Sequence, residues 1–414
     1  MTTVPYWVGD ATHYPSRLRI LFLKCSLFVP ELYAGIELAT HYLCRSLIER
    51  RHHVAVAGRS DRPEFDSDQR AKCDHDCGYP VYRARRFEDA VARSIAEFRP
   101  DAVVCQDPGR WIGIDKFESF RGMAIVLYKH SSRDWFKLVP APIRDRAAYV
   151  SNSASTAAHL KRYGTDSMIV PPLFGIDRFA GLESHGANVL FINMQRSKGA
   201  DIAIEIARQR PDISFVFIDS WTSKLDETAR LQHLAASLPN VKLLQNQPDL
   251  RNVFQTTRLL LMPSRSREGW GRTATEAQLC GIPVLGSSRG QLETTIGPGG
   301  IALDPDAGIS LWLRAFDSIW NDEAYYRVLS CRAKAHAAQL MEQKHAALER
   351  FESCLVSAVK RERLAAMRLL PRQPLVTFDR SVIRKLLRLS LATSRLFVRS
   401  HIARVPIHKL LSIR

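Results

Sequence analysis

Two carboxylates stand eight positions apart around a glycine turn. Glu268 and Glu276 flank the sequence Gly-Trp-Gly, which comes shortly after an apolar run at 259–262. The apolar run is typical of a buried strand, and Gly281 and Pro283 should stop the helix that follows the turn. A strand, a glycine turn and a helix N-terminus favour phosphate, because unpaired backbone N–H groups and the helix dipole attract anions there. Carboxylates do not assist phosphate binding, so the two glutamates indicate that the ligand also carries sugar hydroxyl groups. A ligand with both phosphate and sugar hydroxyls is a nucleotide sugar.

A purely structural interpretation exists for one of the two glutamates. Thr273 and Glu276 also fit a capping box, in which both side chains satisfy unpaired N–H groups at the start of a helix. Glu268 has no comparable explanation, because it precedes a turn and must point into a cleft to act on a ligand. A Gly-x-Gly turn alone is a weak signal, whereas the complete string from Pro263 to Ala277 is much more specific.

The segment from Pro263 to Glu293 closely resembles the donor-site signature of retaining glycosyltransferases with the two-domain B fold, the large family 4 group, or glycosyl transferases group 1. The shared features are Pro-Ser, Glu-Gly-aromatic-Gly, a second glutamate eight residues after the first, and Gly-x-Pro-Val. The resemblance implies that Glu268 contacts the transferred sugar and that Glu276 holds the ribose hydroxyls of the nucleotide. It also implies that the backbone N–H groups of the glycine turn face the sugar and diphosphate: Gly269, Trp270, Gly271 and Arg272.

A second donor motif is expected around Lys198. Lys198 and Gly199 match a Lys-Gly pair of the family, whereas Met194 occupies the position of its usual arginine. Arg196 is near enough in sequence to substitute for that arginine. Two cations at the diphosphate would stabilise the negative charge that grows on the leaving group. The resemblance implies that the nucleoside-diphosphate sugar is a donor substrate and that the enzyme needs no cofactor and no bound metal.

The first half of the chain carries looser matches. The sequence Ala-Gly-Ile-Glu at 34–37 stands where the family usually has Gly-Gly-x-Glu, and Gly35 would let the backbone approach the donor diphosphate. His130 closes an apolar strand, and a lone histidine there is more often a polar residue with satisfied hydrogen bonds than a catalytic one. The resemblance places such a histidine near the transferred sugar, and it matches the sequence at 151–153 to a loop at the domain cleft.

The elements that must position these residues follow an α/β pattern. A strand at 19–23, a helix at about 38–50 and a strand at 53–57 make a βαβ opening, which implies a parallel sheet with helices on both faces. Further strands are expected at 102–105, 124–128, 148–150, 189–192, 214–219, 241–244, 259–262 and 284–286. The predicted fold is two doubly wound, Rossmann-like domains that face a ligand cleft, followed by a basic helical tail.

Four segments are expected along the chain. Residues 1–170 would form an acceptor-side domain, and the proline pair at 171–172 would mark the hinge to a nucleotide-sugar-binding domain at 171–340. The resemblance implies that the C-terminal helical stretch at 323–359 returns from the second domain to the first, and that 341–360 is the part that lies on the first domain. Residues 361–414 would form the tail.

The composition is that of an ordinary soluble protein, with 46% hydrophobic and 24% charged residues among 414. No apolar run reaches the roughly 18 residues that span a bilayer, and the first 17 residues lack an apolar signal core. Eight scattered cysteines suggest free thiols in a reducing compartment. A loop is favoured over a zinc site for the cluster between Cys73 and Cys77. We therefore expect a cytoplasmic protein, with peripheral attachment to the inner face of the membrane left open.

The basic excess belongs to the tail. From Lys360 to Arg414 there are 14 Lys or Arg against two acids, a net of +12, which leaves +5 of the total +17 for the other residues. Arginines on one face and apolar residues on the other predict a basic amphipathic helix over 380–404. An anionic membrane surface and packing on the protein body explain this helix equally well. Nucleic acid is a less favoured partner, because the tail has no interleaved aromatic residues and the rest of the sequence has no nucleic-acid-binding motif.

The sequence thus predicts a retaining glycosyltransferase that moves a sugar to a glycan, lipid-linked or small-molecule acceptor, in cell-envelope or exopolysaccharide biosynthesis. Two alternatives stay open. A nucleotide-sugar epimerase of the same fold would need catalytic acids in the first domain that are not evident, and a scaffold protein would bind the nucleotide sugar without catalysis. By the resemblance, the loop at 245–248 lies at the nucleobase, but its amides do not choose between UDP, GDP and ADP.

Overall fold

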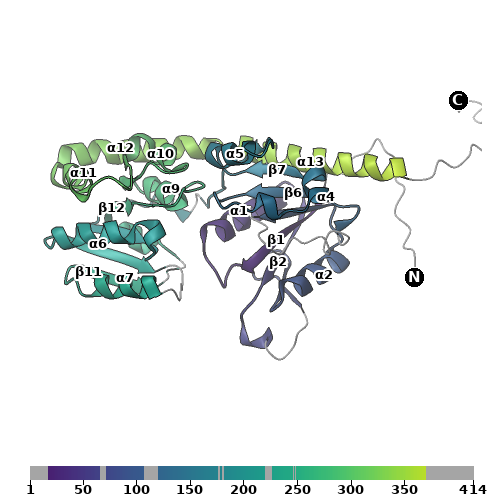
Figure 1. The fold of residues 1–414 in the computed structure, drawn as a ribbon, viewed down its shortest axis with the longest axis horizontal. Coiled ribbons are helices and arrows are strands. Elements are labelled where there is room, and N and C mark those ends of the chain that lie inside the picture. Colours follow the sequence, from purple (N-terminus) through teal and green to yellow (C-terminus); the bar gives the residue numbers. More distant parts are fainter. Residues whose placement is uncertain are drawn as a thin grey trace, which may run out of the picture. The chain divides into compact units, whose positions relative to one another are not determined.

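The computed structural model describes residues 17–65, 71–106, 120–175, 178–179, 181–219, 226–245, 247 and 249–369 of the 414-residue chain. Its described residues up to Leu364 belong to one compact unit. They form two sheets, and helices cover both faces of each sheet (Figure 1). The predicted pair of doubly wound α/β domains is therefore confirmed. The predicted helix at 380–404 and two residues of the loop at 245–248 lie outside the described residues.

The first sheet has the strand order β3-β4-β2-β1-β5-β6-β7-β8, and only the β3–β4 pair among these strands is antiparallel. Its strands are β1 (Arg19–Leu27), β2 (His53–Arg59), β3 (Lys72–Asp74), β4 (Val81–Ala84), β5 (Ala102–Gln106), β6 (Ala124–Lys129), β7 (Ala148–Ser151) and β8 (Met168–Ile169). Its helices are α1 (Gly35–Glu49), α2 (Phe87–Phe98), α4 (Ala141–Arg146) and α5 (Ala154–Lys161), with the short 3-10 turns η1 (Pro63–Phe65) and η4 (Phe136–Leu138).

The second sheet is parallel throughout its described strands, in the order β11-β10-β9-β12-β13-β14. Its strands are β9 (Asn188–Ile192), β10 (Ser214–Asp219), β11 (Val241–Gln245), β12 (Thr257–Met262), β13 (Val284–Ser287) and β14 (Gly300–Leu303). The surrounding helices are α6 (Ala200–Gln209), α7 (Asp226–Ala236), α8 (Arg251–Gln255), α9 (Arg272–Leu279), α10 (Leu292–Ile296), α11 (Ile309–Asn321) and α12 (Glu323–Glu342), with the 3-10 turns η6 (Arg196–Lys198) and η7 (Gly297–Gly299).

The strand order fixes where a ligand site can form. In the second sheet the chain moves from β9 outward to β11 and then returns to the other side of β9 with β12. Neighbouring connections therefore leave in opposite directions between β9 and β12, and open α/β sheets bind ligands in the crevice beside such a reversal. The first sheet has the same reversal between β1 and β5.

Alternating side chains explain why both faces of each sheet are covered. On β1, Ile20 and Phe22 belong to the core on one face, and Leu21 and Leu23 belong to the core on the other. A strand that is apolar on both sides must be buried on both sides, as parallel sheets with crossover helices require.

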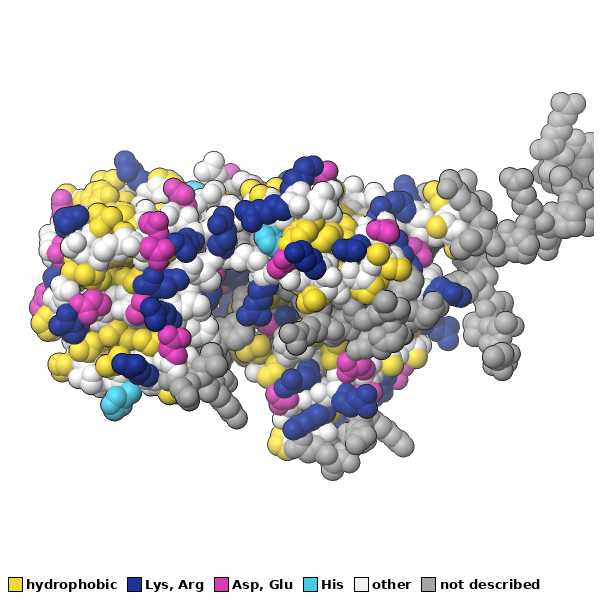
Figure 2. All heavy atoms as spheres, in the orientation of Figure 1, with side chains coloured by type: hydrophobic (Ala, Val, Ile, Leu, Met, Phe, Trp, Pro, Cys, Tyr) yellow, Lys and Arg dark blue, Asp and Glu magenta, His cyan; other side chains and the backbone are white. Residues whose placement is uncertain are grey.

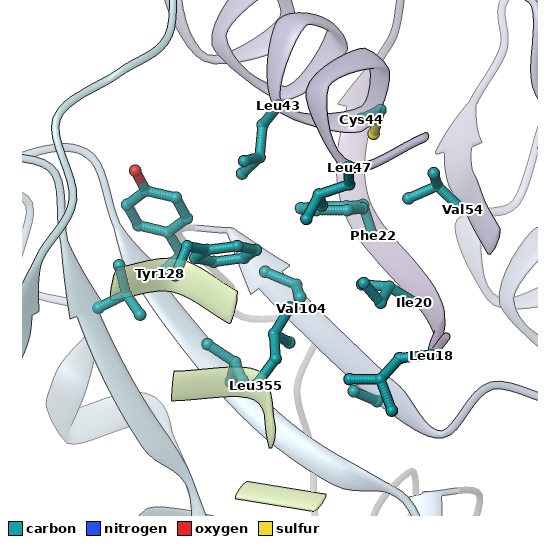
Figure 3. Packing of buried hydrophobic residues seen from close by; sticks show 14 of the residues in the cluster. Leu18, Ile20, Phe22, Leu43, Cys44, Leu47, Val54, Val104, Tyr128 and Leu355 are labelled. Atoms are coloured by element: carbon teal, nitrogen blue, oxygen red, sulfur yellow. The ribbon is translucent and has the colours of Figure 1, made fainter. Parts of the chain in front are cut away.

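The C-terminal helical stretch expected at 323–359 consists of two helices. It breaks at Gln343, between α12 and α13 (Lys344–Leu369). The break follows from two separate burial partners, since Leu329 of α12 belongs to the core of the second sheet and Leu355 of α13 to the core of the first. Figure 3 shows Leu355 in the same cluster as Phe22 of β1 and Leu43 of α1. The exact boundaries of the four expected segments stay predictions.

We expect Phe351→Ala to destabilise the protein by about 3 to 5 kcal/mol, since it removes a buried ring and leaves a cavity. The Phe351 ring is fully buried and lies 6.3 Å from the Phe22 ring and 5.9 Å from the Tyr128 ring, between centroids. Urea denaturation measures the change in the free energy of unfolding. Leu364→Ala on the same helix is the control, because Leu364 is 52% exposed and its loss should change that free energy by less than about 0.5 kcal/mol. Equal effects would contradict the packing of α13 on the first sheet.

Candidate functional site

The loops after β9 and β12 are held against each other at the reversal of the second sheet. Gly199 has a φ of +81°, and a Cβ at this position would lie 2.1 Å from the Pro263 carbonyl oxygen. The backbone N–H groups of Arg265 and Ser266 donate to the Ser197 carbonyl oxygen at 3.0 and 2.9 Å. Only glycine allows this approach without strain, so Gly199 brings the end of η6 to the start of the other loop.

This approach joins Lys198 and Glu268. The Lys198 Nζ lies 2.7 Å from the Glu268 Oε1, and the Ser264 hydroxyl donates to the same oxygen. The Lys198 side chain is 31% exposed and the Glu268 side chain 12%, so the pair is largely withdrawn from solvent. A carboxylate this deeply buried needs charged or polar partners, and Lys198 and Ser264 supply them. The structure thus brings these two predicted site residues together.

Glu276 lies on α9 and does not form the capping box that Thr273 suggested. The N-cap is Gly271, with a φ of +94° and no side-chain cap hydrogen bond. The Glu276 Oε1 instead accepts from Arg272 Nη2 at 2.7 Å, and both side chains are about nine-tenths buried. Glu276 therefore stands one turn inside the helix, paired with the residue that begins it.

Trp270 anchors the glycine turn in the second domain. Its indole N–H donates to the Thr275 hydroxyl at 3.1 Å, and its carbonyl oxygen accepts from the Thr295 hydroxyl at 2.6 Å. The residue is 8% exposed. Its ring therefore packs inside the domain, and what the turn can offer a ligand at this position is its backbone.

Gly269 is where the loops of the two sheets meet. A Cβ on Gly269 would lie 1.9 Å from the His130 carbonyl oxygen, which also accepts from the Asn152 side-chain amide at 3.0 Å. Beside this contact, the Ser132 hydroxyl donates to the Arg267 carbonyl oxygen at 3.1 Å. The loops at the carboxyl ends of β6 and β12 therefore touch through their backbones.

The two predicted residues of the first half lie at the same junction. His130 is 7% exposed, and its ring packs on that of Tyr128 with 4.1 Å between centroids. Gly35 begins α1, and a Cβ there would lie 3.6 Å from the Arg272 Cδ. Ala34 has a φ of −110°, an ordinary extended value, so alanine replaces the family's first glycine without backbone strain.

Arg196 is not brought to the Lys198–Glu268 pair. Its side chain is 62% exposed, and its guanidinium lies 3.5 Å from Glu227. Met194, at the position of the family's arginine, is completely buried in the core of the second sheet. Asn193, the residue before it, takes a left-handed backbone with a φ of +83°, which asparagine tolerates better than most residues.

Two residues of the site were missed from the sequence. Ser264 contacts the Glu268 carboxylate, and the backbone N–H of Gln291 donates to the Glu268 carbonyl oxygen at 2.9 Å. The Gln291 side-chain oxygen also accepts from the backbone N–H of Ser155 at 3.2 Å, which links β13's loop to α5. Both residues stand within the signature from Pro263 to Glu293, so their positions, though not their contacts, were visible in the sequence.

The environments of two histidines, His159 and His41, lower their pKa values. Burial, helped by the positive charges of Lys129 and Arg267, lowers the pKa of His159 on α5. Burial and the charges of Arg45 and Arg178 lower the pKa of His41 to about 4.

Among the described residues, no group of three or more His, Cys, Asp or Glu side chains could hold a metal ion.

Two protein-family models match the chain. The model for Glycosyltransferase Family 4 matches residues 33–177, which include Gly35 and His130. The model for Glycosyl transferases group 1 matches residues 181–336, which include Lys198, Glu268 and Glu276.

Similar curated proteins are D-inositol 3-phosphate glycosyltransferases. The chain is 30% identical to that of Pseudarthrobacter chlorophenolicus over 256 residues, which make up 51% of this chain and 59% of the relative. It is 31% identical to that of Mycobacterium leprae over 169 residues, 38% of this chain and 39% of the relative. The chain therefore spans less than two thirds of the length of either relative.

Solved structures share the fold. Sucrose-phosphate synthase of Thermosynechococcus elongatus has a TM-score of 0.66 at 18% identity, covering 84% of this chain and 100% of the other. HepE of Anabaena in complex with UDP-glucose also has a TM-score of 0.66 at 18% identity, covering 81% of this chain and 100% of the other. At this identity the likeness concerns the two-domain architecture.

We expect Gly269→Ala to lower the free energy of unfolding by about 1 to 3 kcal/mol, because the added methyl group has no room beside the His130 carbonyl. Thermal or urea unfolding followed by circular dichroism measures this change. Gly308→Ala is the matched control, since the nearest atom to its new Cβ would be 4.0 Å away. If both variants unfold alike, the loops after β6 and β12 do not approach as closely as the structure shows.

Proposed function

The chain belongs to glycosyltransferase family 4, and we propose that it transfers a sugar from a nucleoside-diphosphate sugar to an acceptor with retention of anomeric configuration. The observation that carries this proposal is the Lys198–Glu268 pair, 2.7 Å apart at the strand reversal of the second sheet. In this pair Lys198 is a cation that could bind a diphosphate, and Glu268 is a hydrogen-bond acceptor for the hydroxyl groups of a sugar. Lys198 alone would not distinguish a sugar nucleotide from a simpler anion, whereas Glu268 adds a hydrogen-bond acceptor for the sugar.

Each site residue has a distinct proposed role. Glu268 orients the transferred sugar, Glu276 accepts hydrogen bonds from the ribose hydroxyls, and Lys198 neutralises the departing diphosphate. His130 is proposed to lie near the transferred sugar on the acceptor side. Arg196 would have to leave Glu227 to add a second positive charge at the diphosphate, so Lys198 carries most of that role.

The glycine turn completes the donor site. Trp270 is fixed by its indole hydrogen bond, so the backbone N–H groups from Gly269 to Arg272, rather than the indole, would face the sugar and diphosphate. In the proposed reaction the sugar leaves and the acceptor attacks on the same face, while the diphosphate helps to take the acceptor proton. Closure of the two domains on the substrates would exclude water, which strengthens the electrostatic contribution of Lys198.

Substrate identity is proposed only as a class. Curated relatives named for D-inositol 3-phosphate support a small polyol acceptor, and HepE in complex with UDP-glucose supports a uridine nucleotide as donor. A glycan or lipid-linked acceptor in envelope or exopolysaccharide synthesis is the other candidate, favoured by the basic excess after Lys360.

Glu268→Ala should lower kcat for sugar transfer at least about 100-fold, because the sugar loses a contact that matters in the transition state. Donor affinity should change much less, since the variant keeps Lys198 and the glycine turn. Product formation with radiolabelled or mass-detected nucleotide sugars measures kcat, and calorimetry with UDP, GDP and ADP sugars measures binding.

Glu205→Gln is the control, because Glu205 is on the surface of α6 and pairs only with its helix neighbours Arg208 and Gln209 in the described contacts. Undiminished transfer by the Glu268 variant would remove the proposed role. Release of an altered sugar without any acceptor would favour an epimerase, and nucleotide-sugar binding without turnover by the native protein would favour a scaffold.

Membrane attachment through the basic tail is a separate proposal. No described helix is long and apolar enough to cross a membrane. On the face drawn in Figure 2, the Lys and Arg side chains are interspersed with Asp and Glu, as expected if the excess charge resides in the tail. Each basic residue near an anionic surface contributes about 1 kcal/mol, so several together would suffice for binding.

The full chain should sediment with vesicles that contain about 30% anionic lipid and should be released as salt screens the charges. A chain truncated after Leu369 keeps all of α13 and should stay in the supernatant. Vesicles of neutral lipid are the control. Equal sedimentation of both chains would contradict a role of the tail in membrane binding.

A further inference from the structure

The Arg272 side chain makes contacts that the glycine turn by itself does not require. Its Nη2 donates to the Glu276 Oε1 at 2.7 Å, and its Nη1 donates to the Leu173 carbonyl oxygen at 2.9 Å. Leu173 belongs to the segment that connects the two sheets. One guanidinium therefore ties the proposed ribose-binding carboxylate to the backbone of that connection.

Aromatic rings fix the plane of the same guanidinium. The Arg272 Cζ lies 4.5 Å from the centre of the Phe174 ring and 5.8 Å from that of Tyr42 on α1. The Arg272 side chain is only 10% exposed, and Gly35 leaves room for its Cδ. A planar, multidentate cation that is stacked and hydrogen-bonded in this way has little freedom to turn.

Because its partner is fixed, the Glu276 carboxylate is restrained as well. Glu276 is 9% exposed in its side chain, so rotating its charge away from Arg272 would leave it buried and poorly compensated. Arg272 occupies Oε1, and a ribose hydroxyl would then be received by Oε2. The helical pair of Arg327 with Glu323, at 3.0 Å, differs in burial, because both of its side chains are more than half exposed.

We propose that Arg272 is a positioning residue for nucleotide recognition: it holds the Glu276 carboxylate toward the ribose by anchoring it to Leu173 and Phe174. This inference rests on the proposed function, in which Glu276 binds the ribose hydroxyls. It assigns the side chain of Arg272 a task separate from its backbone N–H, which would face the diphosphate.

The test compares a nucleoside diphosphate with its 2′-deoxy counterpart. The native protein should bind the ribose form at least about tenfold more tightly, as expected for a hydroxyl bonded to a charged carboxylate. Arg272→Lys keeps the charge but cannot reproduce the planar fork, and Arg272→Gln removes the charge. Both variants should bring the affinity ratio close to one, mainly by weakening the ribose form. Phe174→Leu, which removes only the stacking ring, should lower the ratio to a smaller extent.

The nucleotide is the one of UDP, GDP and ADP that raises the thermal unfolding temperature of the native protein most. Calorimetry with this nucleotide and its 2′-deoxy form gives the dissociation constants, and thermal unfolding checks that each variant is folded. Arg272→Lys carries the test should Arg272→Gln fail to fold. Arg327→Gln, which breaks a helical pair of the same spacing, is the control and should keep the native ratio. A native ratio in Arg272→Lys overturns the positioning role, while the proposed function stands. Failure of the native protein to bind any nucleoside diphosphate overturns the proposed function itself.

Discussion

The site depends on one electrostatic constraint: a largely buried carboxylate, Glu268, must be kept beside Lys198. Two loops that are 70 positions apart in sequence can satisfy this constraint only if their backbones come almost into contact. Gly199 against the Pro263 carbonyl provides that contact, and Gly290, where a Cβ would lie 2.3 Å from the Glu268 carbonyl oxygen, lets a third loop, the one after β13, approach Glu268 as well. The glycines of the motif are thus required by the packing of loops as well as by the approach of a ligand.

The parallel sheets explain why these loops meet at all. The carboxyl ends of parallel strands lie along one edge, and β9 and β12 are neighbours there although two other strands intervene in sequence. The same rule brings Gly35, which follows β1, and His130, which follows β6, to the corresponding edge of the first sheet. Gly269 and Arg272 then connect the two edges, through the His130 carbonyl and the Leu173 carbonyl.

Much of this architecture could be predicted from the sequence, because continuous apolar runs identify buried parallel strands. The strand at 214–219 matches the structure to the residue. The break between α12 and α13 was not visible, since nothing in the sequence near Gln343 interrupts a helical pattern and only the change of packing partner does so.

Contacts between side chains were harder still to predict from the sequence. Arg196 was expected beside Lys198, yet its direction is set by the η6 turn and by Glu227 on α7. The capping interpretation of Glu276 failed for a similar reason, because Arg272 one turn earlier competes for its carboxylate.

The two proposed ligand-binding carboxylates differ in how firmly their cations are held. Lys198 is 31% exposed and sits on a short 3-10 turn, and its flexible ammonium can exchange Glu268 for a diphosphate without breaking other contacts in the described structure. Arg272 has additional hydrogen-bonding and stacking partners that a nucleotide does not replace. A bound donor would therefore rearrange the first pair and leave the second in place. Such a division suits the proposed reaction, because charge develops at the diphosphate during transfer while the ribose only needs to stay where it was bound.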